Sequence, residues 1–284
     1  MVEFFLQSLA KLGILVFVIC SMLGMGFSLT LEQIIAPLKI RRLVIIALLL
    51  NFALVPLIGF LVITLIPLEE GLAIGLILLA TAAGAPFLPK LAEVAKGDLA
   101  FSVGLMVVLM VVTIIFMPIV LPLILPDVTV NPWNIASSLI FLMVIPLAIG
   151  LLIRKKYESI ASGLRPFMSQ ASTSSLIAVT VLILILNYEY IIGVVGTGAI
   201  LAVLIFVILC ITLGLLGAGK DRERRSVLGL GTAQRNIAAA LLVGGQNFDD
   251  PNVVVMIMVA SFVTFIILFP IAGEFGRRAV NRDK

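Results

Sequence analysis

Long apolar runs, separated by short polar stretches, fill almost the whole chain. A bilayer core of about 30 Å is crossed by roughly 20 apolar residues in a helix, and each run is about that long. The pattern therefore predicts nine membrane-spanning helices, near residues 4–28, 41–66, 70–95, 99–125, 133–153, 166–187, 190–217, 225–247 and 250–275. No stretch between them is long enough for a second domain. We therefore expect residues 1–284 to form one polytopic, all-α membrane domain.

The positions of Lys and Arg test this count, because these residues accumulate in short cytoplasmic loops. The first, third, fifth and seventh loops and the C-terminal tail carry sixteen of the nineteen Lys and Arg residues, and the four alternate loops carry none. Only an odd number of spans produces this pattern. The sequence therefore predicts an N-terminus outside and a C-terminus in the cytoplasm, in a membrane of the bacterial cytoplasmic (inner) type.

The composition agrees with a lipid-embedded chain and excludes most enzyme classes. Hydrophobic residues make up 62% and charged residues 12%, whereas soluble domains run near half apolar and a quarter charged. Cys20 and Cys210 lie inside apolar runs, so we expect them to be buried rather than to bind a metal. The chain has no histidine and no acidic pair at membrane depth, so we expect no catalysis. We also expect no cofactor and no nucleic-acid partner, and the sequence identifies no metal site. The expected surrounding is the lipid bilayer, and the sequence sets no oligomeric state.

Two of the predicted spans are interrupted. The third contains Gly84, Pro86 and Pro89 in one short stretch, and each proline lacks an N–H and disfavours helix at the preceding residue. The eighth contains the longest polar cluster in any span, from Gly231 to Asn236. Irregular backbone at membrane depth occurs where it is buried in protein or lines a water-filled cavity. Interrupted spans in corresponding positions of two halves indicate an inverted-repeat transporter.

The spacing of the interrupted spans predicts how the repeats are arranged. They are five helices apart, so the chain crosses the membrane in opposite directions through them, and each is followed by one more helix in its half. We expect a first repeat at about 4–125 and a second at about 133–275. The first helix of the second repeat has no counterpart, so the first repeat lacks its first helix.

Charged residues inside the interrupted spans are the candidates for substrate binding. Arg235 lies ten residues after Arg225, about 15 Å deep and close to the midplane. A charge there costs about 2.5–3.5 kcal/mol on insertion scales, which favours a functional role; an arginine packed against carbonyl groups is the structural alternative. Lys90 is only six residues from Lys96, so snorkelling or an ion pair with Glu93 is the alternative for it. Further polar side chains are predicted to line the same site, with hydrogen bonds between helices as the alternative: Asn51, Thr232, Gln234 and Asn236.

Several short motifs are shared with one known family. Residues 24–29 read GMGFSL, like that family's GMG(L)(T)L segment, and residues 51–56 look like its next helix. Residues 95–103 read AKGDLAFSV and are the most specific match, and residues 144–150 and 234–241 are similar as well. Together these stretches resemble the bile acid:sodium symporter family over nearly the whole chain. The chain resembles its nine-helix members, which lack the additional first helix of ten-helix members.

The resemblance implies a panel domain and a core domain, in which two unwound helices cross near the midplane. The unwound helices here are the spans around residues 84–90 and 231–236. It further implies transport of an organic anion together with sodium, whose ligands lie at the crossing. Ser102 and Gln234 match sodium-ligating positions. Other positions of the family's sodium sites hold residues without a side-chain oxygen: Leu88, Pro89, Met106 and Leu230.

These differences lead to the hypothesis that fixed cations replace sodium. Arg235 and Lys90 would make the crossing positive, repel sodium and attract an anion, whose carboxylate or sulfonate fits a planar guanidinium. A desolvated Lys90 would couple transport to protons. The sequence thus predicts a secondary active transporter of a small organic anion that works by alternating access. Proton coupling or uniport is expected in place of sodium coupling at the usual sites. The alternatives are an ordinary sodium-coupled symporter and a non-transporting receptor or scaffold on the same fold.

Overall fold

The structure, a computed structural model, describes residues 2–35, 39–125, 131–186 and 193–280, which contain helices and turns and no strand. The helices of the first half are α1 (Val2–Ser28), α2 (Leu31–Ile35), α3 (Arg41–Leu49), the π-helical turn η2 (Leu50–Leu54), α4 (Val55–Leu65), α5 (Glu70–Thr81), α6 (Leu88–Val94) and α7 (Leu99–Ile124). Those of the second half are α8 (Pro132–Leu139), the π-helical turn η3 (Ile140–Val144), α9 (Ile145–Lys156), α10 (Glu158–Leu186), α12 (Ala199–Gly217), α13 (Arg222–Ala233), α14 (Ile237–Asn247) and α15 (Pro251–Val280).

Seven helical segments of the described chain are long and apolar enough to cross a membrane. They include α1, α7, α12, α15 and three segments built from two consecutive helices. The third predicted span is divided between α5 and α6, and α10 is long enough to span but is not among the seven. The chain is therefore a multi-pass, all-helical membrane protein, and the count of nine spans stays a prediction.

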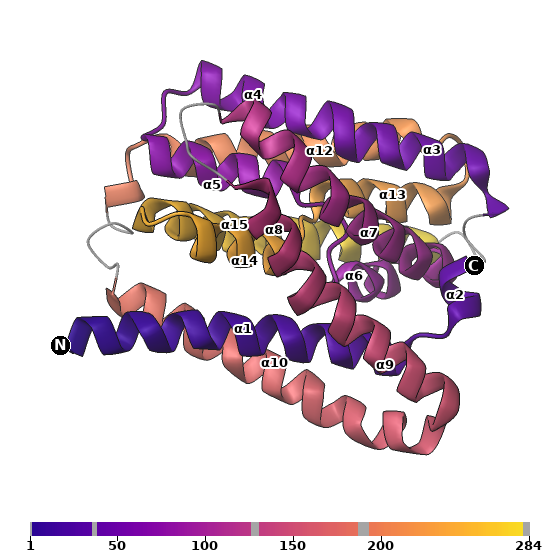
Figure 1. The fold of residues 1–284 in the computed structure, drawn as a ribbon. Helices are drawn as coiled ribbons and strands as arrows, with labels where there is room; N and C mark the ends of the chain where they lie inside the picture. Colours follow the sequence, from indigo (N-terminus) through magenta and orange to yellow (C-terminus); the bar gives the residue numbers. More distant parts are fainter. Residues whose placement is uncertain (1, 36–38, 126–130, 187–192, 281–284) are drawn as a thin grey trace.

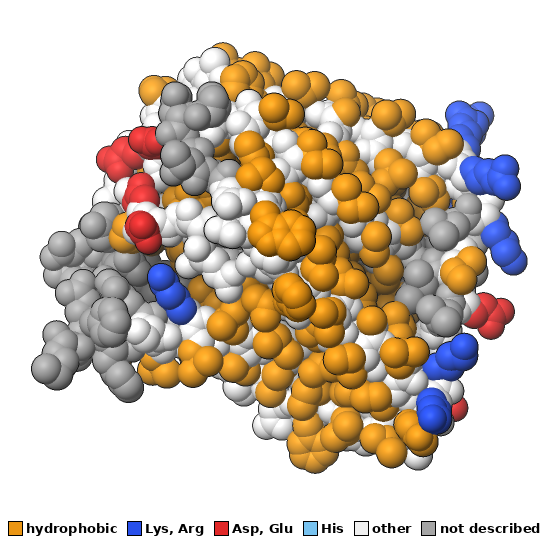
Figure 2. All heavy atoms as spheres, viewed as in Figure 1, with side chains coloured by type: hydrophobic (Ala, Val, Ile, Leu, Met, Phe, Trp, Pro, Cys, Tyr) orange, Lys and Arg blue, Asp and Glu red, His pale blue; other side chains and the backbone are white. Residues whose placement is uncertain are grey.

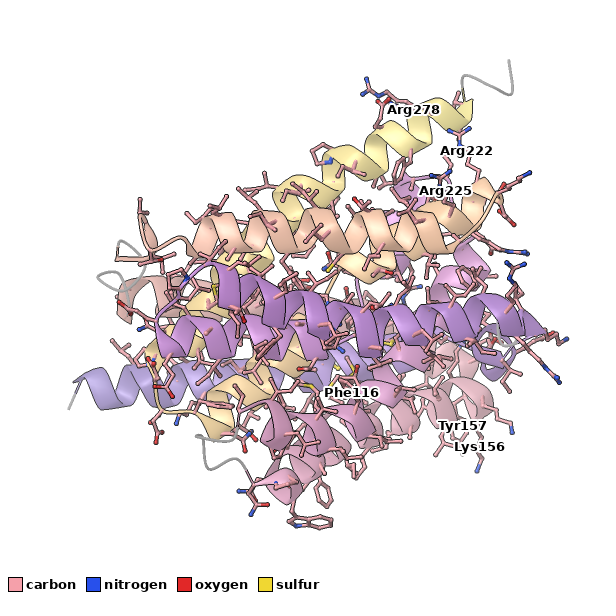
Figure 3. All side chains as sticks on the ribbon, turned by 90° about the horizontal axis from the view of Figure 1, so that it is seen from above. Phe116, Lys156, Tyr157, Arg222, Arg225 and Arg278 are labelled. Atoms are coloured by element: carbon pink, nitrogen blue, oxygen red, sulfur yellow. The ribbon has the colours of Figure 1, made fainter. Side chains whose placement is uncertain are left out.

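The surface is apolar in the middle and charged at the two ends. Figure 2 shows hydrophobic side chains over the broad middle of one face, Lys and Arg gathered at one end, and a cluster of Asp and Glu at the other. Lys156, Arg222, Arg225 and Arg278 all lie toward the first of these ends in Figure 3. We call it the basic end and the opposite one, where α5 and α15 begin, the acidic end.

Two of the long spans contain a π-helical turn, each directly before a helix that carries a proline at its start. The turn η2 precedes Pro56 and η3 precedes Pro146. Because proline has no N–H to continue the helical ladder, the helix locally widens to pass it. In η2 this arrangement leaves Asn51 completely buried inside the bundle. Phe52 packs edge-on against Phe116 of α7, with ring centroids 4.9 Å apart (Figure 3).

The helices pack as two units. The panel unit consists of α1, α8 with α9, and α10; α1 packs extensively along α9 and α10, which lie beside it in Figure 1. At the contact between α1 and α9, a Cβ on Gly26 would lie 2.7 Å from the Cα of Gly150, so both helices need glycine there. The core unit contains the remaining long helices, packed around the two interrupted spans. The units meet where α14 packs against α1 and where α8 packs against α7 and α14. There Ser138 Oγ donates a hydrogen bond to Gln246 Oε1 at 2.6 Å.

One predicted boundary was wrong by eight residues, and one predicted span is interrupted by a turn. Helix α10 begins at Glu158 instead of residue 166, with Pro166 inside it. The residues before Pro166 are largely exposed, so water can satisfy the carbonyl group that the proline leaves free. The predicted span 190–217 is interrupted: residues 193–194 are helical, Gly196 and Gly198 adopt positive φ of 96° and 84° in a turn, and α12 begins at Ala199. Residues 187–192 lie outside the described residues.

Candidate functional site

The two interrupted spans meet in the middle of the core unit. Helix α5 ends at Thr81 and α6 begins at Leu88, while α13 ends at Ala233 and α14 begins at Ile237. We call residues 82–87 the first break and residues 234–236 the second break. The chain runs from the acidic to the basic end through the first and in the opposite direction through the second. Both breaks are therefore reached by the carboxyl end of one half-helix and left by the amino end of another.

Asn236 joins the two breaks and starts α14. Its backbone N–H donates to Ala82 O at 2.9 Å, and its side-chain Nδ2 donates to Gly84 O at 3.1 Å. Its Oδ1 accepts from the backbone N–H of Ala239 at 3.1 Å, which is an N-cap. Asn236 is completely buried, so these bonds satisfy groups that water does not reach. One side chain thus holds the second break against the first.

Helix α7 holds the first break from its other side. The Thr113 hydroxyl accepts from the backbone N–H of Ala83 at 2.9 Å and donates to Ala83 O at 3.0 Å. Gly84 has φ of +79°, and a Cβ there would collide with the backbone of Met110. Gly84 is therefore required both for its conformation and for the close approach of the break to α7. Thr113 was not among the predicted site residues. The feature of the sequence that could have indicated it is a hydroxyl group in a long apolar run.

Arg235 lies at the centre of the crossing and is 3% exposed. Its Nε donates to Leu79 O at 2.9 Å, and its Nη2 donates to Ala80 O at 2.9 Å. Its Nη1 donates to Asn51 Oδ1 at 2.7 Å and to Thr232 O at 3.1 Å. Four of the five guanidinium N–H groups are thus used. Arg235 is therefore packed against carbonyl groups, which is the structural alternative named in the sequence analysis. A bidentate bond from its guanidinium to a substrate would require some of these hydrogen bonds to break.

The charge of Arg235 faces the carboxyl ends of two half-helices. Leu79 and Ala80 belong to the last turn of α5, and Thr232 to the last turn of α13. Carbonyl groups in a last turn lack a helical N–H partner, and each helix end carries about half a negative charge. Together the two ends supply about one negative charge, which offsets the guanidinium. No carboxylate in the described part of the chain forms an ion pair with Arg235; the ion pairs found there lie near the helix ends.

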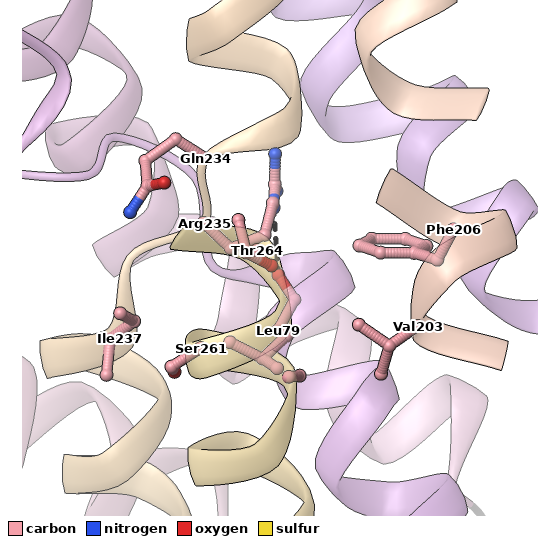
Figure 4. A pocket seen from close by; sticks show the side chains of 9 residues that line it. Leu79, Val203, Phe206, Gln234, Arg235, Ile237, Ser261 and Thr264 are labelled. Carbon is pink, nitrogen blue, oxygen red and sulfur yellow. Dashed lines mark hydrogen bonds between the residues drawn. The ribbon is translucent and has the colours of Figure 1, made fainter. Parts of the chain in front are cut away.

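Gln234 borders a small pocket beside the crossing (Figure 4). The side chain is 1% exposed, and its Oε1 has no hydrogen-bond partner in the described chain. The pocket lies between α12, α15 and the second break and has room for about one water molecule. Ser261 and Thr264 of α15 supply hydroxyl groups to its wall, and Val203 and Phe206 of α12 supply apolar contacts. Neither hydroxyl was predicted as a site residue, because each lies alone in an apolar helix.

The structure separates Lys90 from the crossing. Its side chain is 58% exposed and pairs with Glu93 Oε2 at 2.8 Å. The expectation that Lys90 is desolvated is therefore wrong, and the ion pair with Glu93 is the arrangement found. The cause is position: Lys90 lies in the first turn of α6, past the break, on the surface. Ser102 is buried, but its hydroxyl donates to Leu99 O in its own helix. Ser102 lies eleven residues before Thr113, the residue of α7 that holds the first break, which is about 16 Å along the helix.

Two of the four predicted break positions lie within helices instead. Pro89 lies at the start of α6, because a proline in the first turn loses no helical bond and has the right φ. Gly231 lies inside α13, where a Cβ would be 2.9 Å from a methyl group of Leu88, so it serves helix packing. The second break begins three residues later, at Gln234. Gly84 and Pro86 lie in the first break, as predicted.

The chain matches one known family. Residues 14–194, more than half of the chain, match the sodium bile acid symporter family. The match includes Asn51, the first break and Ser102, and it ends before Arg235 and the second break. No curated protein matches the chain. The extent of the family match and the apolar helices together show that the protein belongs to the sodium bile acid symporter family.

Proposed function

We propose that the protein is a secondary active transporter that moves a small organic anion across the bacterial cytoplasmic (inner) membrane. In this proposal the basic end and the C-terminus are cytoplasmic, and the N-terminus is outside. Family membership and the multi-span fold support a transporter of the bile acid symporter type. The panel and core units move against each other, so that the crossing opens to one side and then to the other. The contact between α8 and α14, on the half toward the acidic end, is one that this movement would break.

The observation that carries the choice of an anion is the charge at the crossing. The guanidinium of Arg235 is offset by the carboxyl ends of α5 and α13, and no carboxylate of the described residues pairs with it. The amino end of α14 begins at the same place and adds about half a positive charge. The sum is positive. A negative substrate is therefore attracted to the crossing, and a sodium ion is repelled.

The residues at the positions of the family's sodium sites support transport without sodium there. Leu88, Met106 and Leu230 are at most 1% exposed and have no side-chain oxygen. In this proposal the fixed charge of Arg235 takes the place of a bound sodium ion, and the driving force is a proton gradient or the gradient of the anion itself.

The size of the pocket beside Arg235 favours a small substrate. In the state described the pocket is narrow, with room for about one water molecule. Two hydroxyl groups and the free oxygen of Gln234 make part of its wall polar. In this proposal the pocket widens as the crossing opens, and a short carboxylate or sulfonate needs less widening than a sterol-sized anion.

The proposal is tested by thermal unfolding of the purified full-length protein with a set of organic anions, in sodium chloride and in choline chloride of equal ionic strength. A ligand that binds only the folded state stabilises it by RT ln(1 + [L]/Kd), so even millimolar affinities are visible. We expect at least one small anion to stabilise the protein equally in both salts, and to be taken up by proteoliposomes without a sodium gradient. If sodium is required for either effect, the protein is an ordinary sodium symporter. If no anion is transported, the transport proposal is wrong.

A further inference from the structure

Four oxygen atoms surround the guanidinium of Arg235. They are the backbone oxygens of Leu79, Ala80 and Thr232 and the side-chain Oδ1 of Asn51, and they lie 2.7–3.1 Å from its nitrogen atoms. We call these four atoms the oxygen cage. They come from three segments that are distant in sequence, the ends of α5 and α13 and the turn η2. The cage therefore exists only in the folded protein.

The chemistry of the cage is that of a cation site. All four atoms are hydrogen-bond acceptors, and three of them belong to the last turns of half-helices, where carbonyl groups run short of helical partners. Of these three, Leu79 O also accepts from the backbone N–H of Ala82 at 3.2 Å. Asn51 turns its oxygen toward the cage because its Nδ2 donates to Ala47 O at 3.0 Å. An empty cage would leave buried acceptors unsatisfied beside two negative helix ends, which is costly in a membrane interior. The cage therefore requires a positively charged donor.

We propose that the oxygen cage is a latent binding site for a small monovalent cation of the guanidinium class, and that the Arg235 side chain is the cation tethered in it. When the side chain is shortened, the cage takes up a free guanidinium ion from solution. The arrangement favours this class, because the four oxygens accept from three different nitrogen atoms of one planar guanidinium at hydrogen-bond distances. The inference goes beyond anion transport and does not depend on it.

A small pocket adjoins the cage. Leu79 and Arg235 belong both to the contacts of the cage and to the wall of the pocket with Gln234, and Figure 4 shows the bond between them at its edge. With Arg235 in place the pocket has room for about one water molecule. Removing the arginine beyond Cβ would join the volume of the deleted side chain to this space.

The test is chemical rescue of Arg235→Ala in the full-length protein, with ethylguanidinium as the probe. This ion has the atoms that the substitution deletes. N-Ethylurea, which has a similar shape and no charge, and sodium chloride serve as matched additives, all near 10 mM. A probe held with a Kd of about 1 mM protects the folded state about elevenfold at that concentration. We expect ethylguanidinium to raise the melting temperature of Arg235→Ala, with little effect on the wild type, whose cage is filled.

Equal effects of ethylguanidinium and N-ethylurea on Arg235→Ala, or equal effects on the variant and the wild type, would overturn the proposal. A second comparison applies even if Arg235→Ala does not fold. Arg235→Lys keeps a cation with three donors, and Arg235→Met fills a similar volume without charge. We expect the lysine variant to be the more stable of the two, and a methionine variant of equal or greater stability refutes the need for a cation. Both comparisons measure stability, so a failure here is separate from a failure of the transport assays.

Discussion

Replacing Asn236 with alanine removes the side-chain bond that joins the two breaks and the side-chain bond that caps α14. The backbone bond to Ala82 remains, because it does not use the side chain. Two bonds are lost: Gly84 O loses the donor Nδ2, and the N–H of Ala239 loses the acceptor Oδ1. Both groups are buried, so water does not replace the lost partners.

The two losses can be assigned approximate free energies. Replacing an N-cap Asn with Ala costs about 1 kcal/mol. Leaving a buried carbonyl without its donor costs about 1–3 kcal/mol, with a value near 2 as the middle of the range. The unfolding free energy of Asn236→Ala should therefore fall by about 3 kcal/mol. Since single substitutions typically cost about 0.5–3 kcal/mol, this change lies at the upper end of that range.

The assay is reversible unfolding of the purified protein by SDS in mixed micelles, followed by circular dichroism. Asn247→Ala is the matched control, because Asn247 is the same residue type in the same helix. Its Nδ2 donates to Val243 O at 3.0 Å at the partly exposed end of α14. We expect the control to lose less than about 1 kcal/mol. Equal losses in the two variants, or no loss in Asn236→Ala, would refute the conclusion that Asn236 holds the crossing together.

Two further predictions concern the ends of the first break. Gly84→Ala should abolish recovery of monodisperse protein in size-exclusion chromatography, because the new Cβ would collide with the backbone of Met110 and φ is +79°. The control Gly273→Ala has open space around the new Cβ and should be recovered like the wild type. Normal recovery of both variants would contradict the close approach of the first break to α7. Lys90→Gln should leave anion uptake by proteoliposomes and its pH dependence unchanged, because Lys90 lies on the surface and its exposed ion pair with Glu93 contributes little to stability. Loss of the pH dependence in this variant would show that Lys90 carries the proton.

The sequence by itself predicted the membrane-spanning character, the asymmetry of charge between the two ends and the two interrupted spans. These features follow from one-dimensional rules. Apolar runs of about 20 residues need no partner to identify them, and buried backbone without a helix has to be satisfied by other protein groups. The buried position of Arg235 also followed from its distance along a helix, because helical rise converts residue number into depth.

Only the tertiary structure decided what those residues contact. Arg235 and Lys90 both looked like charges at a break, yet one is surrounded by oxygen atoms and the other lies on the surface beside Glu93. Thr113 holds Ala83 across thirty residues of sequence. A sequence does not indicate which backbone carbonyl groups form such contacts, since every residue has one. Their role at this crossing arises because two helices end at the same point in space, and that coincidence depends on how distant segments pack.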